Sequence, residues 1–206
     1  FFLKALRDIY DLKVNEPFKQ LFTQGMITHK TYKNTKNEWI MPKDIVLHDG
    51  NLISILTREK IAEGPSEKMS KSKKNVVEPN EILENYGIDA TRIFMISDSP
   101  PDREIEWTDE GIQSSKNLIH RIERYFSHEK SIIQSGIEKN VEKFINDIEK
   151  NILSFSLNKC VADIYTLFNY LEKTKTYLHD SDMSKKILTC IFPIVPKLSL
   201  SINNKL

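Results

Sequence analysis

From residue 110 onward, apolar residues of this 206-residue chain recur every three or four positions in four successive stretches. That spacing places them on one face of an α-helix, and such a face has to be buried against other helices. Polar linkers at residues 127–136 and 179–184 lie between stretches, and Pro193 and Pro196 are expected to end or kink the last one. We therefore expect four amphipathic helices in a bundle. The four stripes consist of Ile112, Ser115, Leu118, Ile119, Ile122 and Phe126; Ile137, Val141, Phe144, Ile145, Ile148 and Ile152; Leu157, Val161, Ile164, Tyr165, Phe168 and Leu171; and Ile187, Leu188, Ile191, Ile194, Val195 and Leu198.

The N-terminal segment is predicted to contain short helical pieces followed by a strand. Residues 1–10 carry apolar side chains at helical spacing, so we expect a helix that packs one face. Asn15-Glu16-Pro17 is typical of a helix start, because Pro is favoured at the first helical position, and it predicts one or two turns through residues 18–22. The stretch Gln24–Thr28 is predicted to begin a core strand of a nucleotide-binding sheet.

Short β-prone runs follow this strand. Asp49-Gly50 between two of them is a strong hairpin signal, because both residue types accept positive φ angles. His29 and His48 are interpreted as structural, since isolated loop histidines are rarely functional. The β-prone runs are residues 39–40, 45–47 and 52–56.

Two more helices are predicted before the helical half begins. Pro79-Asn80 starts the first, which ends at Gly87 in a left-handed conformation. Asp89 is a candidate N-cap for the second, which Ser99-Pro100-Pro101 breaks. Trp107 is interpreted as a packing residue. Strands followed by helices make the expected fold class α+β.

Composition limits the classes of function. The formal net charge is +1, so any RNA contact has to come from local patches rather than from a global basic field. Cys160 and Cys190 lack a Cys-x-x-Cys spacing, so we expect no metal site, and two thiols fit a reducing cytosol. No apolar run approaches the ~20 residues of a membrane span, and we therefore expect a cytoplasmic protein with no membrane partner.

The densest cluster of charge lies within residues 68–74, directly after Gly64-Pro65. It holds four lysines and two serines, and the preceding Gly-Pro marks a loop. Lysine ammonium groups and serine hydroxyls suit a polyanion such as the phosphates of a nucleotide. Composition alone leaves open a solvated loop or a nuclear-localisation-like patch.

The five residues Lys68-Met69-Ser70-Lys71-Ser72 resemble the second signature motif of class I aminoacyl-tRNA synthetases. The surrounding sequence is similar to the bacterial-type leucyl-tRNA synthetases of that class, through about the first 126 residues and more weakly to the end. The similar blocks are Glu16-Pro17-Phe18, Leu21-Phe22-Thr23-Gln24-Gly25-Met26, Lys73-Lys74-Asn75-Val76-Val77-Glu78-Pro79, Tyr86-Gly87-Ile88-Asp89 and Ser99-Pro100-Pro101-Asp102-Arg103-Glu104-Ile105-Glu106-Trp107-Thr108-Asp109.

The resemblance implies a division of the chain into two parts. Residues 1–109 correspond to the C-terminal part of a class I Rossmann-type catalytic domain. Residues 110–206 correspond to a helical tRNA-binding domain, like the anticodon-binding domain of the leucyl, isoleucyl, valyl and methionyl enzymes. Within the first part, the resemblance implies a β-rich insertion at 28–63, the lysine-rich loop at 64–75 and connecting helices at 76–109.

The implied activity is that of a leucine–tRNA ligase, the ATP-dependent activation of leucine and its transfer to tRNA(Leu). By resemblance, Lys71 and Lys68 are the catalytic residues, and Met69, Ser70 and Ser72 complete the ATP-binding set. Mg²⁺ is expected with ATP, and no protein ligand for it is identified in this chain. Many members of the family carry Gly at the position of Lys74, which costs lysine sterically if that position requires φ > 0.

The first signature motif of the family, His-x-Gly-His, does not occur in this sequence. We therefore expect a fragment that is inactive alone and needs an N-terminal half of the enzyme as its partner. Lys116, Arg121 and Arg124 are candidates for contact with the tRNA backbone.

Two alternatives remain open. One is a non-catalytic tRNA-binding or assembly module derived from such an enzyme. The other is the same portion of an isoleucyl, valyl or methionyl enzyme, over which the blocks at residues 23–26 and 104–107 favour leucine.

Overall fold

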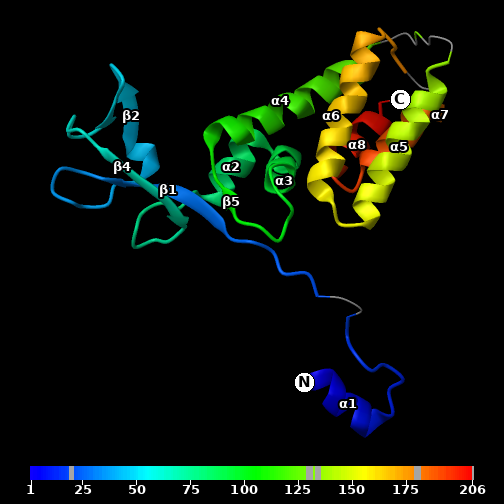
Figure 1. Cartoon of the computed structure of the whole chain (residues 1–206), viewed down its shortest axis with the longest axis horizontal. Helices are drawn as coiled ribbons and strands as arrows, with labels where there is room; N and C mark the ends of the chain where they lie inside the picture. Colours follow the sequence, from blue (N-terminus) through cyan, green and yellow to red (C-terminus); the bar gives the residue numbers. More distant parts are fainter. Residues whose placement is uncertain (19–20, 129–131, 133–135, 179–181, 206) are drawn as a thin grey trace.

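The computed structural model describes residues 1–18, 21–128, 132, 136–178 and 182–205. Within these ranges the fold is α+β, as the sequence predicts, with two small sheets toward the N-terminal half and packed helices in the C-terminal half (Figure 1). No helix of the described ranges is long and apolar enough to cross a membrane.

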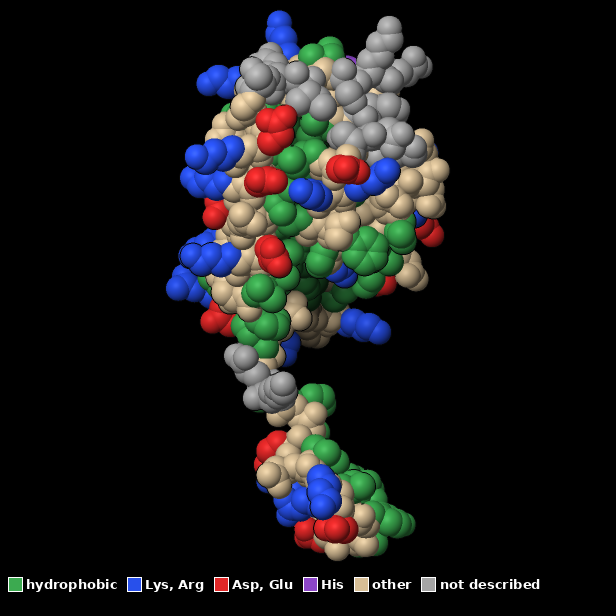
Figure 2. Space-filling view, turned by 90° about the vertical axis from the view of Figure 1, so that its right-hand side faces the viewer, with side chains coloured by type: hydrophobic (Ala, Val, Ile, Leu, Met, Phe, Trp, Pro, Cys, Tyr) green, Lys and Arg blue, Asp and Glu red, His purple; other side chains and the backbone are tan. Residues whose placement is uncertain are grey.

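The N-terminal helix forms as predicted but does not pack. Helix α1 (Phe2–Tyr10) has no buried residue, and Phe2 and Ile9 are 82% and 71% exposed. It lies apart from the rest of the molecule (Figure 1), and Figure 2 shows hydrophobic side chains along one side of this protruding segment. The expectation of a packed face is therefore wrong here, because no surface of the structure lies against that face.

The turns expected after Pro17 are also absent from the described residues on either side of 19–20. Lys19 and Gln20 themselves lie outside the described residues. Phe22 instead stacks on Phe155 of the helical half, with ring centroids 5.7 Å apart. A Pro at a favoured position does not form a helix when only a few residues follow it, because nucleation is costly.

A three-stranded sheet supports the lysine-rich segment. Strand β1 (Ile27–Lys33) is central, with β4 (Ala62–Lys68) antiparallel on one side and β5 (Ile105–Glu106) parallel on the other. The predicted strand thus exists, although it begins at Ile27 rather than at Gln24. Under this sheet lies a small core made of Ile82, Ala90, Phe94, Ile105, Trp107 and Ile112.

Trp107 is a packing residue, as expected. It is buried, and its ring meets Phe94 edge to face with centroids 4.8 Å apart.

Gly64 and Pro65 lie inside β4, so the loop expected to begin there is wrong. The register of β1 and β4 shifts between Lys30 and Tyr32, opposite this pair. A Cβ at position 64 would lie 2.6 Å from Thr31 Oγ1, which donates a hydrogen bond to the Pro65 carbonyl at 3.0 Å. An edge strand with a bulge tolerates Pro, because the missing N–H costs no ladder bond there.

The predicted hairpin is confirmed. Strands β2 (Ile45–His48) and β3 (Asn51–Ser54) pair antiparallel, preceded by the short 3₁₀ helix η1 (Pro42–Asp44). Asp49 and Gly50 have φ angles of 47° and 75°, as a two-residue type I′ turn requires.

Helices α2 (Pro79–Tyr86) and α3 (Ile88–Ser97) form on either side of Gly87, whose φ is 83°. Asp89 does not cap its own helix, contrary to the prediction. It is buried, and its carboxylate accepts hydrogen bonds from the backbone N–H of Leu198 at 2.6 Å and of Lys197 at 3.4 Å, more than a hundred residues away.

The first three apolar stripes become one helix each, as predicted. The fourth is divided, because its first helix ends at Ile191 and Pro196 begins another. Parts of the expected linkers, at 129–131, 133–135 and 179–181, lie outside the described residues, and so does His179. These helices are α4 (Asp109–Phe126), α5 (Glu138–Leu153), α6 (Leu157–Lys173), α7 (Asp182–Ile191) and α8 (Pro196–Asn203).

The helices share one core, which includes the fully buried Phe168 of α6. Both cysteines lie in or against this core as free thiols. Burial raises the pKa of Cys160 to about 12 and that of Cys190 to about 11. Thiols held protonated in this way are poor nucleophiles and poor metal ligands.

Candidate functional site

The lysine loop, residues 68–75, begins where β4 ends. Strand pairing places Lys68 opposite Thr28 of β1, and the Met69 N–H reaches the Ile27 carbonyl at 3.5 Å. Residues 71–74 then form a turn in which the Lys74 N–H donates to the Lys71 carbonyl at 3.3 Å. The loop is therefore a continuation of an edge strand and is anchored at its start by the sheet.

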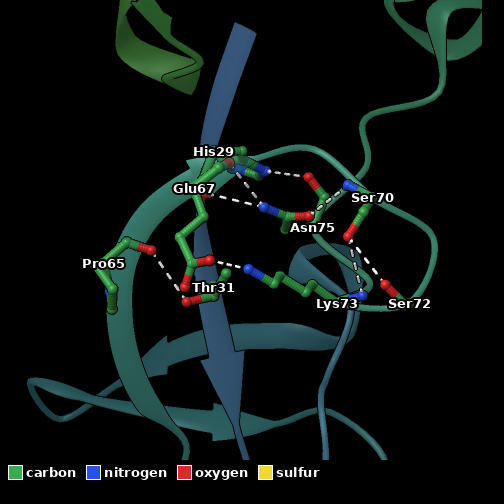
Figure 3. Close-up of polar contacts among 8 residues, drawn as sticks. All are labelled: His29, Thr31, Pro65, Glu67, Ser70, Ser72, Lys73 and Asn75. Carbon is green, nitrogen blue, oxygen red and sulfur yellow. Dashed lines mark hydrogen bonds and ion pairs between the residues drawn. The ribbon is translucent and has the colours of Figure 1, made fainter. Parts of the chain in front are cut away.

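Asn75 closes the loop onto the sheet (Figure 3). Its Nδ2 group donates to the carbonyls of His29 and Glu67, both at 3.1 Å, and its Oδ1 accepts from the Ser70 N–H at 2.9 Å. The Asn75 carbonyl lies 3.2 Å from His29 Nδ1, and Asn75 is only 1% exposed. One buried carboxamide thus joins both ends of the loop to the strand pair.

The two serines form hydrogen bonds within the loop. Ser70 Oγ accepts from the Lys73 N–H at 3.3 Å and lies 3.2 Å from Ser72 Oγ. Their hydroxyls therefore order the turn.

The lysines of the loop differ in their partners. Lys73 Nζ forms a half-buried ion pair with Glu67 of β4 (Figure 3). Among the ion pairs of the described residues, none involves Lys68, Lys71 or Lys74, and all three are exposed. The loop therefore presents three positive charges without an ion-pair partner among the described residues, whereas Glu67 neutralises the charge of Lys73.

A cleft of about 560 Å³ opens beside the loop. Lys71 and Lys74 line it, whereas the other predicted ATP-binding residues, Lys68, Met69, Ser70 and Ser72, do not. The remaining walls combine apolar, aromatic and acidic side chains from the hairpin, β1 and the segment after the loop. They include Tyr32, Met41, Val46, Leu47, Leu52, Val77, Glu78, Glu81, Trp107 and Asp109.

Lys74 has a φ angle of 54°, in the left-handed region. An L-residue with a Cβ pays about 1–2 kcal/mol for this conformation, and Gly pays almost none. The structure therefore gives a physical reason for Gly at this position and identifies lysine as strained there.

We expect Lys74→Gly to raise the free energy of unfolding by up to about 1 kcal/mol, because the released strain exceeds the extra entropy of Gly in the unfolded chain. Urea denaturation of the purified chain measures the change. Lys74→Ala keeps the Cβ and is the matched control, with no gain expected. A gain of equal size in both variants would point to charge repulsion instead of backbone strain.

His29 is held neutral by its surroundings. Burial lowers the pKa of His29 below its ordinary value of 6.5, and the Asn75 carbonyl and the carboxylates of Asp109 and Glu106 oppose this only in part. Because the Asn75 carbonyl can only accept, the neutral His29 ring carries its proton on Nδ1 and donates it to this carbonyl, which ties strand β1 to the end of the loop.

The lowered pKa of His29 makes stability depend on pH. As the pH falls below about 6.5, the unfolded chain takes up a proton at this residue before the folded chain does, so folded stability is lost. We expect His29→Gln to show a shallower loss of unfolding free energy between pH 7.5 and pH 5.5 than the wild type. An unchanged slope in His29→Gln would refute the expectation.

Two of the three residues predicted to contact tRNA form hydrogen bonds or ion pairs within the chain. Lys116 Nζ donates to the Asn85 carbonyl at 2.8 Å, and Arg121 forms a bidentate pair with Glu172, both bonds at 2.8 Å. Arg124 is exposed and lines a separate hollow together with His120 and Lys205.

Sequence reasoning did not identify Asn75 and His29 as site residues. Asn75 directly follows the lysine run, and its place in the similar block at residues 73–79 was a usable signal. His29 had no such signal, because the pairing of β1 with β4 brings it to the loop, where it contacts Asn75 across 46 residues of sequence.

Comparisons with known proteins relate the chain to the class I tRNA synthetases. A family model described as tRNA synthetases class I (I, L, M and V) matches residues 52–108. A leucine–tRNA ligase from Zymomonas mobilis is 39% identical over 203 residues, covering 97% of this chain and 24% of the relative. One from Rickettsia typhi is 32% identical over 218 residues, covering 100% of this chain and 26% of the relative.

The fold also matches a solved structure, the ternary LeuRS–tRNA–LeuAMS complex from Agrobacterium radiobacter K84. The TM-score is 0.67 at 21% identity, covering 98% of this chain and 24% of that one. The chain spans about a quarter of the length of the curated relatives that it matches. Along nearly its whole length, therefore, the chain is homologous to about a quarter of a leucine–tRNA ligase.

Proposed function

We propose that the chain is the part of a leucine–tRNA ligase that supplies the ATP-binding lysine loop and a helical tRNA-binding region. The observation that carries this proposal is Lys71, which is exposed at the edge of a cleft and has no ion pair among the described residues, in a chain similar to leucine–tRNA ligases over 97% of its length. The solved relative was crystallised with tRNA and LeuAMS, which supports tRNA, leucine and a nucleotide as ligands.

The chemistry of the loop follows from its charges. In leucine activation the amino-acid carboxylate attacks the α-phosphorus of ATP, and pyrophosphate leaves. Negative charge builds on phosphoryl oxygens in the transition state, so positioned cations supply most of the available stabilisation. Lys71 and Lys68 have no intramolecular ion pair among the described residues and are free to act on the phosphates, whereas Lys73 is held by Glu67.

In this proposal the described residues do not supply a full set of ligands for Mg²⁺. Among the described residues, no three His, Cys, Asp or Glu side chains are grouped so as to hold a metal ion. Mg²⁺ is usually bound by substrate phosphates, water and one or two carboxylates, so ATP would bring the ion with it.

The proposal assigns roles along the chain. Residues 1–109 form the C-terminal part of a Rossmann-type catalytic domain, with the insertion at 28–63, and residues 110–206 form the tRNA-binding domain. Because Lys116 and Arg121 are engaged within the fold, Arg124 is the best placed of the three candidates for a phosphate of the tRNA backbone. The cytoplasm, where ATP and tRNA are available, is the proposed location.

Leucine-dependent ATP–pyrophosphate exchange tests the function. The assay compares the chain alone with the chain mixed with a polypeptide carrying the N-terminal half of a leucine–tRNA ligase, including the first signature motif. Exchange only in the mixture supports the proposal, and exchange by the chain alone shows that the site is complete without a partner. No exchange in either, with tRNA binding retained, would favour the non-catalytic module.

The amino acid is tested in the same assay. Replacing leucine with isoleucine, valine or methionine should abolish exchange, because the similar relatives are named for leucine. Exchange with one of these amino acids and not with leucine would assign the chain to the related enzyme.

A further inference from the structure

The conformation of the lysine loop depends on a residue outside the five-residue motif. The loop leaves the sheet at Lys68, where the Met69 N–H still reaches the Ile27 carbonyl, and it returns at Asn75. Between Ser70 and Lys74 the remaining contacts are hydrogen bonds within the turn and the Lys73–Glu67 ion pair. The Asn75 side chain is the long-range connection, because it reaches both strands of the pair and the Ser70 N–H at once (Figure 3).

The geometry at position 75 requires a carboxamide. Two carbonyl acceptors face Nδ2 and one N–H donor faces Oδ1, so both hydrogens and the oxygen of the amide are used. An aspartate would place a carboxylate oxygen against the carbonyls of His29 and Glu67. An apolar residue would remove the side-chain partner of three buried or part-buried backbone groups, and each loss costs stability.

The same contacts offset the strain beside Asn75. Lys74 is left-handed, and such a conformation persists only where its surroundings over-determine it. The carbonyl of Asn75 is held by His29, and its side chain is held by the strands, so the chain has to turn sharply at Lys74 to reach these partners. That turn brings Lys74 and Lys71 together at the edge of the cleft.

We propose that Asn75 is a positioning residue, which acts through Lys71 by holding the lysine loop in the conformation that presents this lysine to a phosphate-bearing ligand. The inference rests on the proposed function of the loop in phosphate binding. Asn75 touches no reacting atom, and its effect is expected to disappear when Lys71 is absent.

The first arm of the experiment measures the connection itself in the 206-residue chain. We expect Asn75→Ala to speed hydrogen exchange of the Ser70 amide by about tenfold, because that amide loses its acceptor. Asn204→Ala, at an exposed asparagine after α8, is the matched control and should leave this amide unchanged. Unchanged protection of Ser70 in Asn75→Ala would overturn the inference. If that variant does not fold, Asn75→Ser carries the test, because a hydroxyl retains one donor and one acceptor.

The second arm measures coupling to Lys71, with inorganic pyrophosphate as the probe in an NMR titration of the same chain. We expect Asn75→Ala to raise the Kd for pyrophosphate about fivefold in the wild-type background and less than about twofold in Lys71→Ala, since interacting residues are non-additive. Asn75→Asp should weaken binding at least as much as Asn75→Ala.

Additive losses would overturn the inference, because a merely structural role predicts additivity. Failure of the wild-type chain to bind pyrophosphate would overturn it as well. The exchange assay is separate from both arms. Coupling with pyrophosphate but no leucine-dependent exchange would keep the positioning role and refute the proposed function.

Discussion

Lys71→Ala is expected to lower leucine-dependent ATP–pyrophosphate exchange by about 100-fold or more, the scale of losing one donor to a transition-state charge. Lys71 is exposed at the cleft and forms no ion pair among the described residues, so its charge is available to a phosphoryl group. The loss should fall mainly on kcat and less on the KM for ATP, because a contact made only in the transition state does not help ground-state binding.

Lys74→Ala is the matched control for Lys71→Ala. It removes a lysine from the same loop and the same cleft, and we expect little loss of exchange. Both variants are assayed in the mixture with the N-terminal polypeptide. Equal losses from the two would mean that the loop acts through its total charge, and the assignment of Lys71 would be refuted.

Asp89→Ala is expected to lower the free energy of unfolding by about 2–3 kcal/mol. Helix α8 begins at Pro196 and has no cap of its own, so its first free N–H groups belong to Lys197 and Leu198. The buried Asp89 carboxylate accepts from both, and hydrogen bonds to a charged group at a helix N-terminus are among the stronger ones. Its removal leaves donors unpaired and α8 uncapped.

Thermal unfolding measures this effect, and a loss of that size corresponds to about 5–10 °C in a chain of this length. Asp89→Asn keeps an acceptor without the charge and should lose about half as much. Asp98→Ala, at the exposed C-terminal end of the same helix, is the matched control and should change the melting temperature by less than about 2 °C. Equal melting temperatures for Asp89→Ala and the wild type would show that the contact does not stabilise the helix.

Asp89 and Arg92, on the same helix, both form hydrogen bonds with the backbone where α7 ends and α8 begins. Arg92 donates to the carbonyls of Ile194 at 3.1 Å and Pro193 at 2.7 Å, in the turn between α7 and α8. One face of α3 thus satisfies both the carbonyls that end one helical stretch and the N–H groups that begin the next. This contact joins the segment that follows the lysine loop to the C-terminal helices.

Much of the local structure was readable from the sequence. The helical stripes became α4 to α6, the Asp49-Gly50 pair became a type I′ hairpin, and Pro193 and Pro196 divided the last stripe. The lysine-rich segment was identified from its sequence motif, and the exposure of Lys68, Lys71 and Lys74 agrees with that interpretation.

The lysine loop also shows where reading the sequence failed. Gly64-Pro65 was expected to open a loop, because Gly and Pro usually interrupt regular structure. The pair lies in β4 because Thr31 approaches from the neighbouring strand and the bulge removes the need for a proline N–H. Asp89 is a residue type that favours the N-cap position, but it caps α8 instead of its own helix. The N-cap residue of α8 is Val195, which has no polar side chain to accept these hydrogen bonds.

The sequence by itself determined the features that depend on a few consecutive residues: helical periodicity, turn φ angles and helix-breaking prolines. Tertiary structure alone decided the contact of Asn75 with His29 and the partners of Asp89 and Arg121, because each of these contacts joins residues 46 or more positions apart along the chain. It also left α1 uncovered, although the pattern of α1 predicts a packed face. Local sequence patterns determine which side of a helix or strand is apolar or polar, and the packing of distant segments determines which residues that side contacts.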